Sequence, residues 1–212
     1  MNCESRITDC TLMKAAIFDV DGTILDTMNM WAHLAKNYLA TLGIHTQEDI
    51  DRKFLSATID VVASYMKEKY FLGLSETEIK QGVIDCAADF YFTKAQVKEG
   101  MMDYIMKLKE KNIPMVIASS GEQKLIKGAF ERLDLMKYFS GIYTGDKNTP
   151  DLFNQCLEKL GTKPHETFVF EDGIHAIETA KKMGLKTVVV RDIQENFSEI
   201  EKIADYSWEA IR

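Results

Sequence analysis

The alternation of short apolar runs with amphipathic segments after Gly100 limits the possible folds more than any other feature. Runs rich in β-branched and aromatic residues predict strands at 114–118, 142–143, 167–170 and 186–190. Apolar residues at helical intervals predict helices over 101–112, 123–133 and 150–160, and one more that ends before Gly184. Strands that alternate with helices in this way favour a parallel sheet with helices on both faces. The chain is therefore expected to fold as an α/β protein with a doubly wound parallel sheet.

A further strand is predicted at 15–18, and two aspartates follow it directly. Asp19 and Asp21 are separated by one residue, and Gly22 allows the chain to turn. Side chains at i and i+2 leave a strand on the same side, so both carboxylates can point into one space at the strand end. In a partly dry pocket their repulsion costs energy or raises one pKa. A divalent cation between them removes the repulsion, and ligands that are all oxygen suit Mg²⁺.

The tetrapeptide Asp-x-Asp-Gly has a simpler reading as well. Aspartate and glycine both favour turns, so an ordinary loop stays open as an interpretation of these four residues taken alone. An EF-hand calcium loop that starts at Asp19 is excluded, because its twelfth position is Met30 and a bidentate glutamate is needed there.

Polar residues also follow two of the other predicted strands. Ser119 and Ser120 come after 114–118, Glu171 and Asp172 come after 167–170, and Lys147 lies in the segment that leads to the helix at 150. Each of them alone can be a turn residue, a helix cap or an exposed charge. Ligands of parallel sheets bind beyond the carboxyl ends of the strands, so together these residues predict a site at that edge.

The segment between the first strand and Gly100 has a helical pattern throughout. Apolar spacing predicts helices over 28–42 and over 47–71, the second interrupted near Ser56. Ser75 and Glu78 form a capping box that opens a third helix. We therefore expect a Rossmann-like core made of residues 13–26 and 97–212, an inserted all-helical domain of residues 27–96, and a loose leader of residues 1–12.

Composition excludes several classes of partner. A net charge of −7 over 212 residues argues against nucleic acid and anionic membrane surfaces. No apolar run approaches the roughly 18 to 20 residues that span a bilayer. The four cysteines lack zinc-site spacing, and free thiols in an acidic globular chain favour the cytoplasm. A monomer is expected, with a dimer as the alternative.

The strand-end motifs, taken in order, resemble those of the haloacid dehalogenase superfamily in its phosphatase and phosphomutase form. The resemblance covers residues 13–27 and 99–190, and the helical insert lies where that superfamily places its helical cap, as in β-phosphoglucomutase and the phosphoglycolate phosphatase-like enzymes. The matching motifs are Asp19-Val-Asp21-Gly-Thr, the strand that ends in Ser119, Lys147 ahead of Pro150-Asp151-Leu-Phe153, and the strand that ends in Glu171-Asp172.

The resemblance implies a role for each catalytic group. Asp19 would be the nucleophile and would form an aspartyl-phosphate, while Asp21 would protonate the leaving oxygen and later deprotonate the attacking water. Ser119, Ser120 and Lys147 would bind the phosphoryl group, and Lys147 would also screen the nucleophile.

The resemblance also implies a magnesium cofactor. Mg²⁺ would be held by Asp19, the backbone carbonyl of Asp21 and Asp172, with Glu171 at the ion or hydrogen-bonded to its ligands. The implied enzyme is a Mg²⁺-dependent phosphatase of a small phosphate monoester, so the expected partner is a small phosphorylated metabolite. The cap is expected to select that metabolite.

Two alternatives remain. β-Phosphoglucomutases grip a second phosphate with a Lys and an Asn a few residues after the serine, where this chain has Glu122 and Gln123, and a carboxylate there repels a second phosphate. A catalytically weak protein that only binds a phosphorylated ligand is the other alternative, since a fold does not fix a function. The intact set of Asp19, Asp21, Lys147 and Asp172 argues against it.

Overall fold

The computed structural model describes residues 13–51, 58–193 and 197–210. The chain divides into two compact units, one made of Met1–Asp26 with Gln96–Arg212 and one made of Thr27–Ala95. The predicted leader of residues 1–12 and the predicted interruption near Ser56 lie outside the described residues. The assignment of the units as catalytic core and cap stays a prediction.

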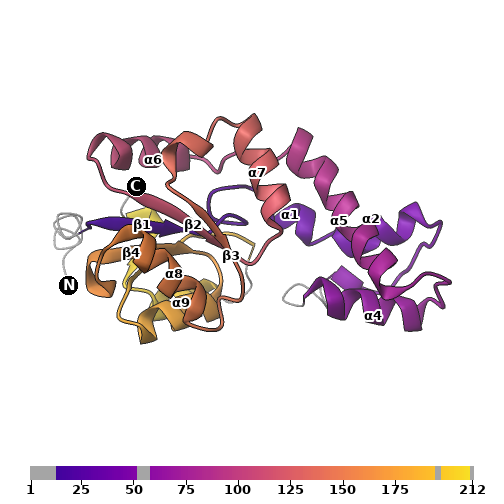
Figure 1. Cartoon of the computed structure of the whole chain (residues 1–212). Coiled ribbons are helices and arrows are strands. Elements are labelled where there is room, and N and C mark those ends of the chain that lie inside the picture. Colours follow the sequence, from indigo (N-terminus) through magenta and orange to yellow (C-terminus); the bar gives the residue numbers. More distant parts are fainter. Residues whose placement is uncertain (1–12, 52–57, 194–196, 211–212) are drawn as a thin grey trace. The chain divides into compact units, whose positions relative to one another are not determined.

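Six parallel strands form the sheet of the larger unit in the described part of the chain (Figure 1). They are β1 (Ala15–Phe18), β2 (Met115–Ser119), β3 (Ile142–Thr144), β4 (Thr167–Glu171), β5 (Lys186–Val189) and β6 (Tyr206–Ser207), in the order β3-β2-β1-β4-β5-β6. Every residue of β1, β2 and β4 is buried, as expected for strands covered on both faces. The predicted Rossmann-like parallel sheet is confirmed.

Helices cover both faces of this sheet. They are α6 (Met101–Glu110), α7 (Gln123–Arg132), α8 (Asp151–Leu160), α9 (Ile174–Lys182) and α10 (Phe197–Ile203), with short 3₁₀ turns at Met136–Tyr138, Pro164–Glu166 and Trp208–Ala210. Figure 1 shows α8 and α9 on one side of the sheet and α6 and α7 on the other. Successive residues of β1 serve the two faces. Ile17 packs with Phe153 of α8, whereas Phe18 stacks on Phe170, 4.3 Å between ring centroids.

The strand order reverses at β1, and this reversal positions the site. Phe18 lies in register with Ile117 of β2 on one side and with Phe170 of β4 on the other. The residues that follow β1 and β4 therefore leave the sheet next to each other. Such a switch point, at the carboxyl ends of the strands, is where open α/β sheets bind their ligands.

The smaller unit is helical throughout its described residues. It contains α1 (Met28–Trp31), α2 (Leu34–Thr41), α4 (Ile59–Lys69) and α5 (Glu76–Thr93). The predicted capping box at the start of α5 is confirmed, because the backbone N–H of Glu78 donates to Ser75 Oγ at 3.2 Å and the N–H of Ser75 donates to the Glu78 carboxylate at 2.7 Å. No helix in the described ranges is long and apolar enough to cross a membrane.

Two helix boundaries differ from the predictions. The single helix predicted over 28–42 is wrong, because α1 ends at Trp31 and α2 begins at Leu34. The ring Nδ1 of His33 lies 2.8 Å from the carbonyl of Asn29, the acceptor that its own N–H would use in a continuous helix, and that N–H donates instead to Met30 at 3.1 Å.

The second difference concerns α8. The helix predicted over 150–160 begins one residue later, because Pro150 occupies the capping position and α8 starts at Asp151. The hydroxyl of Thr149 donates to the carbonyl of Asp146 at 3.3 Å, so it bonds back into the preceding loop rather than to the helix.

Candidate active site

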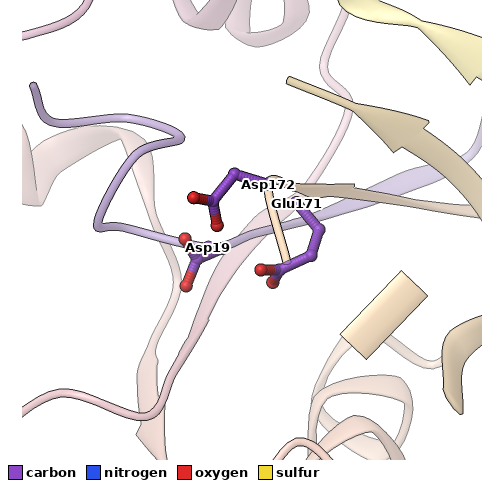
Figure 2. Close-up of side chains that lie close together, drawn as sticks. All are labelled: Asp19, Glu171 and Asp172. Atoms are coloured by element: carbon purple, nitrogen blue, oxygen red, sulfur yellow. The ribbon is translucent and has the colours of Figure 1, made fainter. Parts of the chain in front are cut away.

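Three buried carboxylates meet at the ends of β1 and β4. The N–H of Asp19 donates to the carbonyl of Phe170 at 3.0 Å, so the parallel ladder continues one residue past β1. Asp19, Glu171 and Asp172 are 4%, 2% and 7% exposed. Figure 2 shows their carboxyl groups converging, and one oxygen from each lies within 4.8 Å of the others. Burying several acids together is costly unless a positive charge accompanies them.

Lys147 supplies one such charge. It lies in the loop between β3 and α8, and its Nζ is 2.5 Å from Asp19 Oδ1 and 2.7 Å from Glu171 Oε2. In the same loop, Asp146 Oδ1 accepts from both the N–H and the side-chain amide of Asn148, at 2.8 and 2.7 Å. Burial alone would lower the pKa of Lys147, but the charges of Asp19 and Glu171 outweigh burial and raise it above the usual range. Lys147 is therefore a permanent cation.

One lysine does not balance the acidic cluster. Burial and the charge of Asp19 raise the pKa of Glu171, although Lys147 and the N–H of Gly173, 3.0 Å from Oε1, act in the opposite direction. Burial, followed by the charges of Glu171 and Asp19, raises the pKa of Asp172 well above its ordinary value. The raised pKa values of Glu171 and Asp172 mean that their charged forms are poorly stabilised here, first by burial and then by mutual repulsion.

The donor set of the cluster fits a magnesium ion. Asp19 Oδ2 is buried and has no hydrogen-bond partner among the described residues, so one oxygen of the central carboxylate is left for a ligand. Both oxygens of Glu171 already accept hydrogen bonds, from Lys147 and Gly173. Carboxylate and carbonyl oxygens without nitrogen or sulfur are what Mg²⁺ prefers.

Asp21 and Ser119 border the same small space at the ends of β1 and β2. Ser119 is 1% exposed, and its Oγ accepts from the N–H of Gly121 at 3.0 Å. A Cβ placed on Gly121 would lie 3.2 Å from Asp21 Oδ2 and 3.3 Å from Ser119 Oγ. Any larger residue at position 121 would therefore crowd both polar groups. Ser120, predicted to bind phosphate, is exposed next to them.

The structure thus brings most of the predicted residues together, while their catalytic roles stay predictions. One cluster holds Asp19, Lys147, Glu171 and Asp172, and Asp21 and Ser119 adjoin it around Gly121.

Sequence reasoning missed two residues at this edge of the sheet. Lys98 Nζ donates to the carbonyl of Gly22 at 2.7 Å and to the carboxylate of Asp192. Asp192 comes shortly after the predicted strand at 186–190, as Asp172 comes after the strand at 167–170. This position in the sequence could have identified Asp192 as a candidate. No spacing or motif in the sequence singles out Lys98.

Several curated relatives of the chain are phosphatases by name. A phosphorylated carbohydrates phosphatase of Thermotoga maritima is 26% identical, and the match covers 83% of this chain and 84% of that protein. A fructose-1-phosphate phosphatase of Escherichia coli is 26% identical, over 82% of this chain and 95% of that protein.

Solved structures share the fold over almost the whole chain. CbbY from Rhodobacter sphaeroides, in complex with phosphate, matches with a TM-score of 0.77 at 19% identity, over 93% of this chain and 94% of that one. A β-phosphoglucomutase from Clostridium difficile matches with a TM-score of 0.71 at 17% identity, over 92% and 90%. The family model of haloacid dehalogenase-like hydrolases matches residues 16–190. The chain therefore belongs to the haloacid dehalogenase-like hydrolase family, as its strand-end motifs predicted.

Proposed function

We propose that this protein is a Mg²⁺-dependent phosphatase that hydrolyses small phosphorylated sugars through an aspartyl-phosphate on Asp19. The observation that carries the proposal is the state of the Asp19 carboxylate. Lys147 holds Oδ1, and Oδ2 is buried without a hydrogen-bond partner in the described part of the chain. The sugar class is supported by relatives named for phosphorylated carbohydrates and fructose 1-phosphate.

In the first half-reaction, an oxygen of Asp19 attacks phosphorus and the bond from phosphorus to the leaving oxygen breaks. Asp21 donates its proton to that oxygen, so the sugar leaves as a neutral alcohol. Lys147 offsets negative charge on Asp19 and on the phosphoryl oxygens. Ser119 Oγ accepts from Gly121, so its own proton is the one it offers to a phosphoryl oxygen.

In the second half-reaction, water attacks the same phosphorus atom and the bond to Asp19 breaks. Asp21, now a carboxylate, accepts the proton of that water and returns to its acid form. Inorganic phosphate leaves, and Asp19 is restored as a carboxylate. A single residue with two roles suits Asp21, whose carboxyl lies beside Ser119 at the ends of β1 and β2.

Magnesium supplies the charge that lets a phosphate dianion approach this acidic pocket. Asp19, the backbone carbonyl of Asp21 and Asp172 would hold the ion. Glu171 would bind it or orient its ligands, because Lys147 and the N–H of Gly173 already engage both of its oxygens.

Positions 122 and 123 favour hydrolysis over a mutase reaction. Glu122 is an exposed acid at the N-terminus of α7, where a second phosphate would have to be gripped. Gln123 Nε2 donates to the carbonyl of Ile142 at 3.1 Å, so its amide is directed to the neighbouring strand. We expect the protein to act on one phosphate group at a time, as a monomer and in the cytoplasm, where its free thiols at Cys86 and Cys156 suit a reducing environment.

The test is release of inorganic phosphate from a panel of hexose, hexitol and pentose phosphates, nucleotides and phosphoglycolate, with Mg²⁺ or with a chelator. The wild type is expected to favour sugar phosphates and to lose activity in the chelator. Asp19→Asn is expected to be inactive, whereas the matched change Asp103→Asn, at an exposed position of α6, keeps full activity.

Two outcomes would overturn the proposal. Equal activity of the wild type and Asp19→Asn would remove the nucleophile. Conversion of β-glucose 1-phosphate to glucose 6-phosphate without net phosphate release would favour the mutase.

A further inference from the structure

We propose that Lys98 is a positioning residue that, together with Asp192, fixes the turn carrying Asp21 and so aims the proton donor at the leaving group. This inference rests on the proposed function, since it assigns Asp21 the acid role. It concerns Lys98 and Asp192, which are not members of the acidic cluster.

The ammonium group of Lys98 has an acceptor for each of its three donors. Nζ lies 2.7 Å from the carbonyl of Gly22 and 2.6 Å from the carbonyl of Arg191, and it also pairs with the carboxylate of Asp192. The side chains of Lys98 and Asp192 are 18% and 5% exposed. A lysine with all three protons engaged, paired with a buried acid, is held in one place.

These bonds join three segments of the larger unit at the edge of the sheet where the site lies. Gly22 belongs to the turn after β1, Arg191 and Asp192 follow β5, and Lys98 lies on the segment that re-enters the unit at residue 96. The backbone of Lys98 adds to the junction, because its N–H donates to the carbonyl of Ile24 at 2.8 Å.

Gly22 is consequently held at both of its peptide groups. Its N–H donates to the carbonyl of Leu25 at 2.9 Å, and its carbonyl accepts from Lys98. Its φ of +81° lies in the left-handed region, where glycine has no steric penalty but also no side chain to restrict it. The hydrogen bond from Lys98 therefore restricts the backbone at Gly22, where glycine itself imposes little restriction.

The direction of the Asp21 side chain depends on this restriction. Asp21 precedes Gly22 directly, so a shift of the backbone at Gly22 displaces the Cα of Asp21 and moves its carboxyl relative to Ser119 and Gly121. Proton transfer requires hydrogen-bond contact with the leaving oxygen, and small misplacements of a catalytic group cost large factors in rate. Lys98 therefore acts on catalysis through Asp21.

A positioning role of Lys98 can be distinguished from a merely structural one by how the loss in kcat/KM depends on the leaving group. Alkyl phosphates release a strongly basic alkoxide and need the proton of Asp21, whereas an aryl phosphate such as 4-nitrophenyl phosphate releases a stable anion and needs it less. A mutation that only reduced the amount of folded enzyme would lower kcat/KM for both substrates by one common factor.

The experiment measures kcat/KM for a sugar phosphate and for 4-nitrophenyl phosphate, with Mg²⁺ present. In Lys98→Met we expect kcat/KM for the sugar phosphate to fall about tenfold or more and that for the aryl ester to fall less than about threefold. Asp21→Asn should shift the ratio in the same direction and further. Lys98→Arg, which keeps the charge and several donors, should restore much of the ratio.

Lys14→Met is the matched control. Lys14 precedes β1 at the opposite end of that strand and pairs with Glu166 at 2.5 Å. Its loss also breaks a lysine–carboxylate pair, and the ratio of the two kcat/KM values should not change.

A second measurement does not depend on activity. Amide hydrogen exchange of the peptide covering residues 19–26 should be faster in Lys98→Met, while β4 keeps its protection. If Lys98→Met leaves Asp192 buried without its partner and does not fold, the double variant Lys98→Met with Asp192→Asn removes that charge and should show the same two changes.

An unchanged ratio in a folded, active Lys98 variant would overturn the inference and leave the phosphatase assignment intact. Equal phosphate release by the wild type and Asp19→Asn would instead defeat the proposed function, and hydrogen exchange would still decide whether Lys98 holds the turn. Unaltered exchange at residues 19–26 would overturn that structural role.

Discussion

Lys147 places a positive charge next to two carboxylates of the acidic cluster. It is the cation that touches both Asp19 and Glu171, at 2.5 and 2.7 Å. Replacing it removes the cation that faces two buried acids and takes a positive charge from the path of the phosphoryl group. A charge placed where negative charge develops is often worth a factor of about 10² to 10³ in turnover.

We expect Lys147→Met to lower kcat by about 10²-fold or more with Mg²⁺ present, because the phosphoryl oxygens lose their fixed cation. The measurement is steady-state phosphate release. Lys159→Met, at an exposed position of α8, is the control and should keep wild-type turnover. Turnover within about twofold of wild type in folded Lys147→Met would show that metal charge alone supports the reaction.

The sequence predicts at which edge of the sheet the site residues lie, but it does not predict which of them contact one another. Asp19, Ser119 and Asp172 follow apolar runs that predict buried strands, and the carboxyl ends of parallel strands share one edge. The pairing of Lys147 depends on the path of an exposed loop, which no periodic pattern encodes. Lys98 was missed for the same reason, since its acceptors are mostly backbone carbonyls of distant turns.

At the scale of the elements, the short strand β6 pairs with β5 and is also anchored by side-chain hydrogen bonds of Asp205. It has only two residues, and Asp205 just before it binds β5 and α9. Asp205 Oδ2 accepts from the N–H and the hydroxyl of Thr187 at 2.9 and 3.0 Å, and Oδ1 accepts from Lys181 at 2.9 Å. Burial raises the pKa of Asp205, but these bonds together outweigh burial and lower it below its ordinary value.

Because the pKa of Asp205 is lowered, the stability that its hydrogen bonds contribute depends on pH. A carboxyl whose pKa is lower in the folded than in the unfolded state adds stability above the unfolded pKa, and that stability disappears as the pH falls through the folded pKa. Asp205→Asn should lower the free energy of unfolding by about 1 to 2 kcal/mol at neutral pH, with the difference shrinking below about pH 4. Urea denaturation of both proteins across this range is the measurement, and a difference independent of pH would contradict the account.

A glycine inside α5 gives a second prediction at this scale. Replacing a helical glycine by alanine normally stabilises a helix by about 0.5 to 1 kcal/mol. A Cβ at Gly82, however, would lie 2.4 Å from Cε2 of Tyr38, which is buried in the same unit at 4% exposure.

Gly82→Ala is therefore expected to destabilise the helical unit by about 1 to 3 kcal/mol, because the ring of Tyr38 must move out of a packed position. Chemical denaturation followed by circular dichroism measures this change. Thr77→Ala, at an exposed position of the same helix, should be neutral or slightly stabilising. Stabilisation by Gly82→Ala would show that the tyrosine moves at little cost.

The elements that sequence reasoning found and those it missed differ in what specifies them. The strands β1, β2 and β4 consist mostly of apolar residues and are buried along their whole length, so their composition predicts them. The break between α1 and α2 depends on the His33 ring, and β6 depends on Asp205. A contact made by a single side chain does not change the periodicity of the sequence, so a periodic pattern does not predict it.

At the scale of the whole molecule, the site exists only when distant segments have come together. Asp19 and Lys147 are 128 residues apart in the chain, and Lys147 and Glu171 are 24 apart. The unfolded chain cannot present the same set of oxygens, so an ion that binds the cluster stabilises the folded state.

Mg²⁺ is accordingly expected to raise the thermal unfolding midpoint by several degrees, in line with about 2.7 kcal/mol at a concentration one hundred times the dissociation constant. Asp172→Asn, which removes a proposed ligand, should abolish most of this shift, while Asp103→Asn should keep it. Calorimetry with Mg²⁺ and with a chelator is the measurement. An identical midpoint under both conditions for the wild type would argue against a resident magnesium site.

The most direct test of the account is chemical trapping of the phosphorylated enzyme. The protein is mixed with a sugar phosphate and Mg²⁺, quenched within the first turnover, and reduced with borohydride, which converts an aspartyl-phosphate to homoserine. Peptide mass spectrometry should then find the reduced residue at position 19, and neither in Asp19→Asn nor without substrate. Active enzyme that yields no reduced carboxyl, or yields one at another aspartate, would contradict the assignment of Asp19 as the group that accepts the phosphoryl.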